Sequence, residues 1–157
     1  MIPTGFHSSD INIDMIHHPP FPYQPPVAEY EKASSGYLMS LVAIMVGMPF
    51  PIVNLVATGI FYLGNRRGGY FTRWHCTQAM LSQSTLFIIN IFAVSWTLYV
   101  FFGAGELNNY YIAYLITALL INLLEFIMTI YTAVKTRRGV HVEWWFWGPM
   151  AHALCRK

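Results

Sequence analysis

Three long apolar runs constrain this chain more than any other feature of its sequence. They extend over residues 37–63, 76–102 and 110–134. A helix needs about 20 apolar residues to cross a hydrocarbon core about 30 Å thick, and the second and third runs are each long enough. Hydrophobic residues make up 55% of the chain and charged residues 10%, a balance typical of membrane proteins. The sequence therefore predicts an all-α integral membrane protein with two long transmembrane helices.

The first run differs from the others because Pro49 and Pro51 lie near its centre. Each proline lacks a backbone N–H group and clashes with the preceding helical turn, so the pair ends or bends a helix. Each half of the run would be about 18 Å long as a helix, which is too short to cross the hydrocarbon core. Residues 37–63 therefore form either one bent span or a proline-broken pair of short helices that makes a re-entrant hairpin.

The composition divides the chain into a proline-rich extended arm at 1–32, a transmembrane helical domain at 33–135 and an aromatic interfacial tail at 136–157. The prolines of the arm favour an extended backbone. The arm is either a flexible tail or a docking segment, in which case Phe21 and Tyr23 bind a partner subunit. The arm lacks the pattern of a cleaved signal, so a span is expected to act as the insertion signal.

Basic residues gather at one end of the long spans. They precede the second span and follow the third, whereas the turn at 103–109 contains one acid and no base. The positive-inside rule then places these basic segments and the C-terminus in the cytoplasm. Basic loops at a membrane surface account for the positive charge, so nucleic acid is not an expected partner. The basic residues are Arg66, Arg67, Arg73, Lys135, Arg137 and Arg138.

Polar side chains recur every three or four residues in both long spans, which places them on one face of each helix. A charged carboxylate near the middle of the bilayer is costly, so we expect Glu125 to be neutral and to donate a hydrogen bond to Thr85, to a backbone carbonyl, or to Asn54 or Asn90. The polar groups either hold the helices together, line a polar passage or peptide groove, or transfer protons. Counting from the cytoplasmic ends pairs Gln78 with Thr132, Ser82 with Thr129, and Thr85 with Glu125. The predicted polar stripe comprises Gln78, Ser82, Thr85, Asn122, Glu125 and Thr129.

Aromatic and basic residues at the ends of the long spans are typical membrane-interface anchors. The tryptophans of the tail have a second interpretation, in which they are buried against a partner subunit. The predicted anchors are Arg73, Trp74, His75, Trp144, Trp145 and Trp147.

Metal binding and catalysis find little support in the sequence. His75 could join His141 or His152 at a metal or haem site, but no regular helical spacing links them. Cys76 and Cys155 form no CxxC motif. We therefore predict no metal site and no cofactor. Since no nucleophile motif, phosphate loop or suitable carboxylate pair is present, we also expect no enzymatic activity.

Four segments together resemble a known family: PFPIVNLVATGIFYL, NRRGGYF, FTRWHCTQAM and RRGVHVEWWFWGPM. They are similar to the small four-helix membrane proteins that include the twenty-kilodalton Tic translocon subunit of plastids and uncharacterised bacterial relatives. The resemblance covers about residues 37–152. It implies a four-helix topology with both termini on one side, which favours the proline hairpin, and a part in protein translocation. Glu125, the tryptophan-rich tail and the proline-rich arm depart from the family pattern and favour a bacterial protein.

The expected function is therefore non-enzymatic assistance in protein translocation or membrane-protein insertion within a larger assembly. Alternatives are a structural accessory subunit of an unrelated membrane complex, or a small-solute channel formed by an oligomer. The expected partners are membrane lipid, other membrane-protein subunits and a translocating polypeptide. The expected location is the bacterial cytoplasmic (inner) membrane, as a multi-pass protein with a cytoplasmic C-terminus, with the plastid inner envelope as the alternative.

Overall fold

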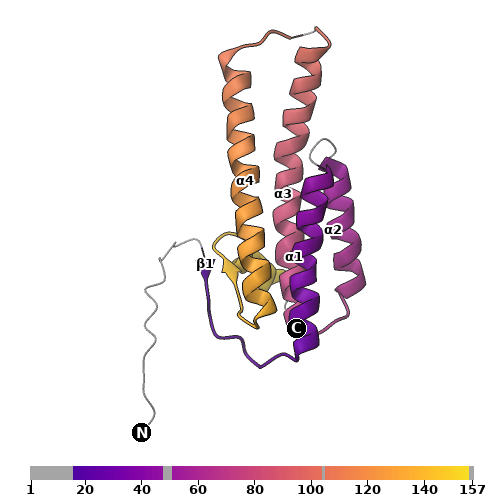
Figure 1. Cartoon of the computed structure of the whole chain (residues 1–157), viewed down its shortest axis with the longest axis vertical. Coiled ribbons are helices and arrows are strands. Elements are labelled where there is room, and N and C mark those ends of the chain that lie inside the picture. Colours follow the sequence, from indigo (N-terminus) through magenta and orange to yellow (C-terminus); the bar gives the residue numbers. More distant parts are fainter. Residues whose placement is uncertain (1–15, 48–50, 104, 156–157) are drawn as a thin grey trace.

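The computed structural model describes residues 16–47, 51–103 and 105–155, and these are mostly helical (Figure 1). This confirms the predicted all-α class at the level of helix content. A two-stranded antiparallel sheet is added to the five helices. The elements are β1 (Ile16–His17), α1 (Val27–Gly47), α2 (Pro51–Asn65), α3 (Tyr70–Phe101), α4 (Asn109–Arg137), β2 (Glu143–Trp144) and α5 (Trp147–Leu154).

The two longest helices, α3 and α4, are long and apolar enough to cross a membrane. They extend well beyond the ends of α1 and α2, and a short connection joins them at that far end (Figure 1). The side chain of Asn108 caps α4 by accepting a hydrogen bond of 2.8 Å from the Tyr111 N–H group. Such a cap satisfies one of the backbone donors that the first helical turn leaves without a partner. The structure has the break between Phe101 and Asn109, close to the predicted turn at 103–109. Helix α3 begins at Tyr70, earlier than the predicted start at residue 76.

Helices α1 and α2 lie side by side against the lower half of α3 (Figure 1). The break between them follows Gly47 and ends at Pro51, where the sequence predicted a proline break, and residues 48–50 lie outside the described part. Small polar residues bring the two helices together, since the hydroxyl oxygens of Ser40 and Thr58 are 3.3 Å apart. Small residues allow helix backbones to approach closely in an apolar environment. The described residues therefore form two separate helices and not one bent span, and α1, with 21 residues, is longer than the short helix that the sequence predicted.

The N-terminal segment and the C-terminal tail meet at the lower end of the bundle. Strand β1 pairs antiparallel with β2, with Ile16 opposite Trp144 and His17 opposite Glu143. Helix α1 starts at Val27, so the last residues of the predicted extended arm are helical. Helix α5 packs against α3 and contacts β2. This end of the molecule is therefore built from segments that are far apart in the sequence.

The buried core lies at this lower end and not along the length of α3 and α4. Its main cluster contains Tyr37, Ala79, Ala133, Val142 and Trp144. The outer surfaces of α3 and α4 instead carry large exposed apolar side chains. A water-soluble monomer rarely exposes so much apolar surface. The fold thus separates into a packed lower end and a projecting apolar helix pair.

Candidate functional site

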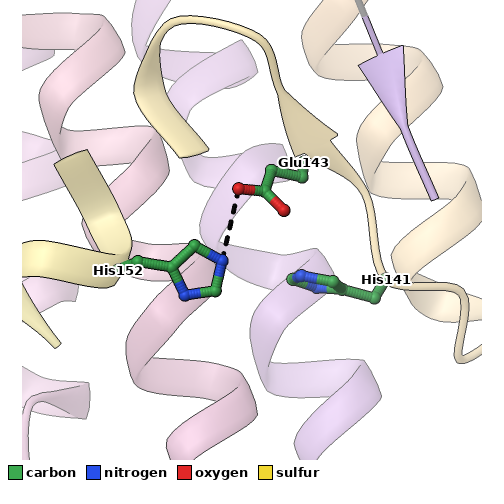
Figure 2. A group of neighbouring side chains, drawn as sticks. All are labelled: His141, Glu143 and His152. Atoms are coloured by element: carbon green, nitrogen blue, oxygen red, sulfur yellow. Dashed lines mark ion pairs between the residues drawn. The ribbon is translucent and has the colours of Figure 1, made fainter. Parts of the chain in front are cut away.

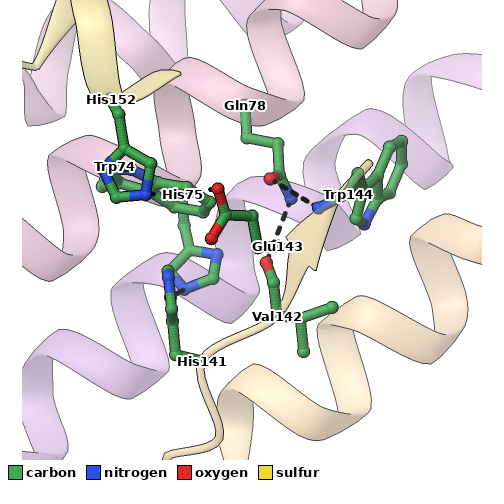
Figure 3. A network of polar contacts seen from close by, with 8 residues as sticks. All are labelled: Trp74, His75, Gln78, His141, Val142, Glu143, Trp144 and His152. Atoms are coloured by element: carbon green, nitrogen blue, oxygen red, sulfur yellow. Dashed lines mark hydrogen bonds and ion pairs between the residues drawn. The ribbon is translucent and has the colours of Figure 1, made fainter. Parts of the chain in front are cut away.

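A glutamine side chain of α3 hydrogen-bonds to the backbone of β2, which also pairs with β1. Gln78 is fully buried on α3. Its Oε1 accepts a hydrogen bond of 3.2 Å from the Trp144 N–H group, and its Nε2 donates to the Val142 carbonyl at 3.3 Å (Figure 3). Buried backbone groups need such partners because leaving them without one is costly. Gln78 therefore fixes the backbone on both sides of Glu143.

The indole of Trp144 attaches β2 to α4 from the other side. Its Nε1 donates a hydrogen bond of 2.7 Å to the hydroxyl of Thr132, and both residues are buried. The indole also stacks on the ring of Tyr37, with 6.3 Å between the ring centres. With Gln78 on one side and Thr132 on the other, β2 is held between α3 and α4.

Two histidines and a glutamate come together next to this strand. Residues 141 and 143 are two apart in an extended segment, so their side chains leave the backbone on the same side. His152 arrives from α5, and its Nε2 lies 3.2 Å from Oε1 of Glu143 (Figure 2). One ligand atom from each of His141, Glu143 and His152 lies within 4.8 Å of the others. The cluster therefore combines three side chains that commonly bind metal ions.

His141 is the end of a buried chain of hydrogen bonds that continues through His75 to Tyr37. Nδ1 of His141 lies 3.1 Å from Nε2 of His75, and Nδ1 of His75 lies 3.0 Å from the hydroxyl of Tyr37. The same hydroxyl accepts a hydrogen bond of 2.9 Å from Gln78. His75 and Tyr37 are almost entirely buried. The chain leaves Nε2 as the ring nitrogen of His141 that faces away from His75.

Burial lowers the pKa of one member of the cluster, His141. Burial, and then the neighbouring His152 and His18, lower the pKa of His141 from 6.5 to about 4. His141 is therefore neutral near pH 7. Since His152 is about half exposed and Glu143 is mostly buried, the cluster is open on the side of α5. A neutral imidazole and a carboxylate can both donate an electron pair to a metal ion.

The predicted interface anchors occupy different positions. Trp74 and His75 are fully buried, with the Trp74 indole donating to Nδ1 of His152 at 3.3 Å. Arg73 donates to the Cys155 carbonyl at 3.2 Å. Trp144 is buried as well, whereas Trp145 is exposed. The lower end of α3 is covered by the protein's own tail, which the helical pattern of α3 could not indicate.

Trp147, the last of the predicted anchors, is partly buried against the main core cluster. Its ring meets that of Phe146 edge to face, with 4.5 Å between the centres. It thus lies between the core and the surface of the tail.

The two arm residues predicted to dock on a partner contact their own chain. The ring of Phe21 packs against Phe71 and His141, at 4.9 and 4.8 Å between ring centres. The Tyr23 hydroxyl donates to Glu29 and accepts from the Phe71 N–H group. The N-terminal segment thus covers one side of the His141 ring. Docking on a partner subunit stays a prediction.

The predicted polar stripe is brought together in part, in a different register. Ser82 donates to Glu125, one helical turn from its predicted partner Thr129. Gln83, which was not predicted, also donates to Glu125. Thr129 forms a hydrogen bond with Glu125 within α4. Thr85, the predicted partner of Glu125, instead donates to the Leu81 carbonyl of its own helix.

Further along the same pair of helices, Asn122 and Asn90 exchange hydrogen bonds of 2.7 and 3.0 Å. The predicted pairing assumed that α3 and α4 pack as a simple hairpin. Helix α1 packs more extensively on α4 than α3 does, so the two long helices are not in continuous contact. Gln78 and Thr132, which were predicted to pair, both hold β2 instead. The register is set by how α1, α3 and α4 dock together, which the spacing within one helix does not determine.

The His141, Glu143 and His152 cluster was not predicted from the sequence. The only local signal is the H-x-E spacing of the first two residues, which places both side chains on one side of an extended strand. His152 joins them only because α5 folds back over α3. A search for helical ligand spacings therefore misses the site.

Comparison with known proteins gives one family. The family model described as the magnetosome magnetite crystal formation protein family matches residues 33–151. No curated protein and no solved structure was found to match the chain.

This match corrects the interpretation based on sequence resemblance. The resemblance to the Tic translocon subunit family is wrong, because the family that matches is a different one. The expected role in protein translocation or membrane-protein insertion was inferred largely from that resemblance and is wrong as well. The segment around RWHCTQAM was too short to identify the family. Its His75 and Gln78 are explained by the packing of β2 against α3.

Proposed function

Because the chain belongs to the magnetosome magnetite crystal formation protein family, we propose that it is a membrane protein that takes part in forming magnetite crystals. The observation that carries the proposal is the extent of the match. Residues 33–151 include most of α1, all of α2, α3, α4 and β2, and the first part of α5. The match therefore covers both the apolar helices and the packed lower end.

The two long helices support a place in the membrane. Their length and hydropathy fit a bilayer, and their exposed apolar side chains need an apolar environment. We place α3 and α4 across the membrane that encloses the growing crystal. By the positive-inside rule, the basic residues at the lower end face the cytosol. The connection at 103–109, with the exposed Glu106, then faces the crystal compartment.

Lipid is the first partner in this proposal, because it would cover the apolar faces of the long helices. Other membrane-protein subunits are the second, and the exposed Trp145 and Phe146 offer them an aromatic surface. We propose that the protein acts without catalysing a reaction. Its part would be to bind or position components at the membrane where the crystal grows.

The proposal is tested by removing the protein from a magnetosome-forming cell and imaging the crystals by electron microscopy. We expect a change in crystal number, size or shape, with recovery when the full chain is supplied again. Crystals identical to those of the parent cell would exclude the proposal. Expressing an unrelated membrane protein at the same membrane level in the deletion cell controls for the effect of expression itself.

The orientation is tested separately by introducing cysteines for labelling in intact vesicles. The native Cys76 and Cys155 are buried, so they give little background. With a reagent that does not cross membranes, Arg138→Cys should be labelled from the cytosolic side and Glu106→Cys only after the membrane is opened. The reverse pattern would invert the orientation.

A further inference from the structure

We propose that His141, Glu143 and His152 bind one divalent transition-metal ion, and that in the cell this ion is ferrous iron. The binding site rests on the geometry of the lower end of the bundle. The choice of iron rests in addition on the proposed function, since magnetite is an iron oxide.

The spacing of the three side chains is close to that of a metal site. Around an ion bound by nitrogen and oxygen at about 2.0–2.2 Å, neighbouring ligand atoms lie about 3–3.5 Å apart. Nε2 of His152 and Oε1 of Glu143 already have this spacing, at 3.2 Å. All three ligand atoms lie within 4.8 Å of one another, so side-chain movement, chiefly of the half-exposed His152, has to close the remaining distance. Figure 2 shows both imidazole rings directed toward the region of the carboxylate.

The buried hydrogen-bonded chain holds the His141 ring by its Nδ1 atom. A histidine ligand commonly donates its second ring N–H group to a neighbouring acceptor, which fixes the tautomer and the direction of the ring. Here Nδ1 of His141 can donate to Nε2 of His75, which in turn can donate from Nδ1 to the Tyr37 hydroxyl. An ion bound at Nε2 of His141 requires this arrangement of protons, in which the Tyr37 hydroxyl accepts hydrogen bonds from both His75 and Gln78.

Neighbouring groups also fix the position of Glu143. Its backbone neighbours on both sides are held by Gln78. A side chain at Gly148 would overlap Glu143, so the glycine in α5 leaves the room that the carboxylate occupies. The carboxylate is thereby directed toward His152 and away from solvent.

His152 supplies the adaptable ligand. It is about half exposed, and its Nε2 is shared with Glu143 while its Nδ1 accepts from Trp74. An ion bound at Nε2 of His152 would take the place of the proton between Nε2 and Glu143. The proton of the neutral ring would then be on Nδ1. The long Trp74 hydrogen bond would then be lost, and the exposed ring has room to adjust. Closure of the site therefore depends mainly on His152.

The ligand set itself selects the class of metal. Two imidazoles and one carboxylate, with further positions left open for water, are typical of ferrous iron and related first-row ions. Magnesium and calcium prefer oxygen ligands. The site lies at the same end as the basic residues, so the proposed orientation exposes it to cytosolic iron. It would then collect iron before the ion reaches the crystal compartment.

The test uses the purified full chain in detergent, freed of metal with a chelator and titrated with Fe²⁺ without oxygen. We expect one ion per chain by calorimetry or equilibrium dialysis. Co²⁺ should give the absorption bands of a site with nitrogen and oxygen ligands. His152→Ala and Glu143→Gln should each lower the affinity by about tenfold or more, and Zn²⁺ and Mg²⁺ titrations measure the selectivity.

A matched control separates the site from general effects. Glu106→Gln removes a carboxylate from the exposed turn at the far end of the long helices. This variant should bind Fe²⁺ like the parent, and circular dichroism verifies the fold of every variant.

The site is excluded if the folded parent chain binds no stoichiometric Fe²⁺, or if the two ligand variants bind as tightly as the parent. Failure of this test leaves the crystal phenotype of the deletion unaffected. Conversely, normal crystals in the deletion would exclude the proposed function while the purified protein still binds the ion. The two proposals can therefore fail independently.

Discussion

His75 and His141 are joined by a hydrogen bond of 3.1 Å between Nε2 and Nδ1, although they are 66 residues apart. The first belongs to α3, and the second precedes β2 in the tail. Both are buried, so the tail is part of the core and not a peripheral attachment. This one contact links the packing of the lower end to the direction of a proposed metal ligand.

Replacing Gln78 by leucine should lower the free energy of unfolding by about 1–3 kcal/mol, because the buried N–H group of Trp144 and the Val142 carbonyl lose their partner. Denaturant unfolding in detergent measures the loss. Limited proteolysis should also show faster cleavage within residues 139–146. Gln24→Leu, at an exposed position, is the matched control. Equal stability of the two variants would show that Gln78 does not hold β2.

Trp144 and Thr132 should be energetically coupled through their hydrogen bond of 2.7 Å. Trp144→Phe and Thr132→Val each remove one partner, and we expect the double variant to be less destabilised than the sum of the two. A coupling energy of about 0.5–1.5 kcal/mol is expected in a double-mutant cycle. Additive effects would mean that the indole stabilises β2 only by packing.

Replacing Glu125 by glutamine should lower the stability of the fold less than replacing it by leucine. Glu125→Gln keeps an acceptor for Ser82, so stability should change little. Glu125→Leu removes the acceptor and should cost about 1–3 kcal/mol in thermal or chemical unfolding. Glu106→Gln and Glu106→Leu, in the exposed turn, are the matched pair. An equal loss of stability in both Glu125 variants would show that an amide oxygen cannot replace the carboxyl group as the acceptor for Ser82.

Gly148→Ala should weaken metal binding by about tenfold or more, because the added methyl group would displace Glu143. Titration with Fe²⁺ measures the change. Gly64→Ala is the control, since nothing lies within 4 Å of the position of its added methyl group. Unchanged affinity in Gly148→Ala would show that the carboxylate is not a ligand.

The sequence by itself determined the elements that depend on local properties. Apolar length predicted α3 and α4, and Pro49 and Pro51 predicted the break between two short helices. Spacing also placed Ser82, Glu125 and Asn122 on inner faces. These features follow from hydropathy, backbone chemistry and helical period, which are all encoded within short segments.

Only the tertiary structure decided what the polar residues at the lower end contact. His75 and Trp74 looked like surface anchors because nothing in α3 indicates that α5 and β2 cover them. His152 joins His141 and Glu143 through the return of α5, and the docking of α3 on α4 brings Ser82 to Glu125. Such contacts depend on how separate segments dock, and docking is determined by the complementarity of whole surfaces and not by the spacing within one helix.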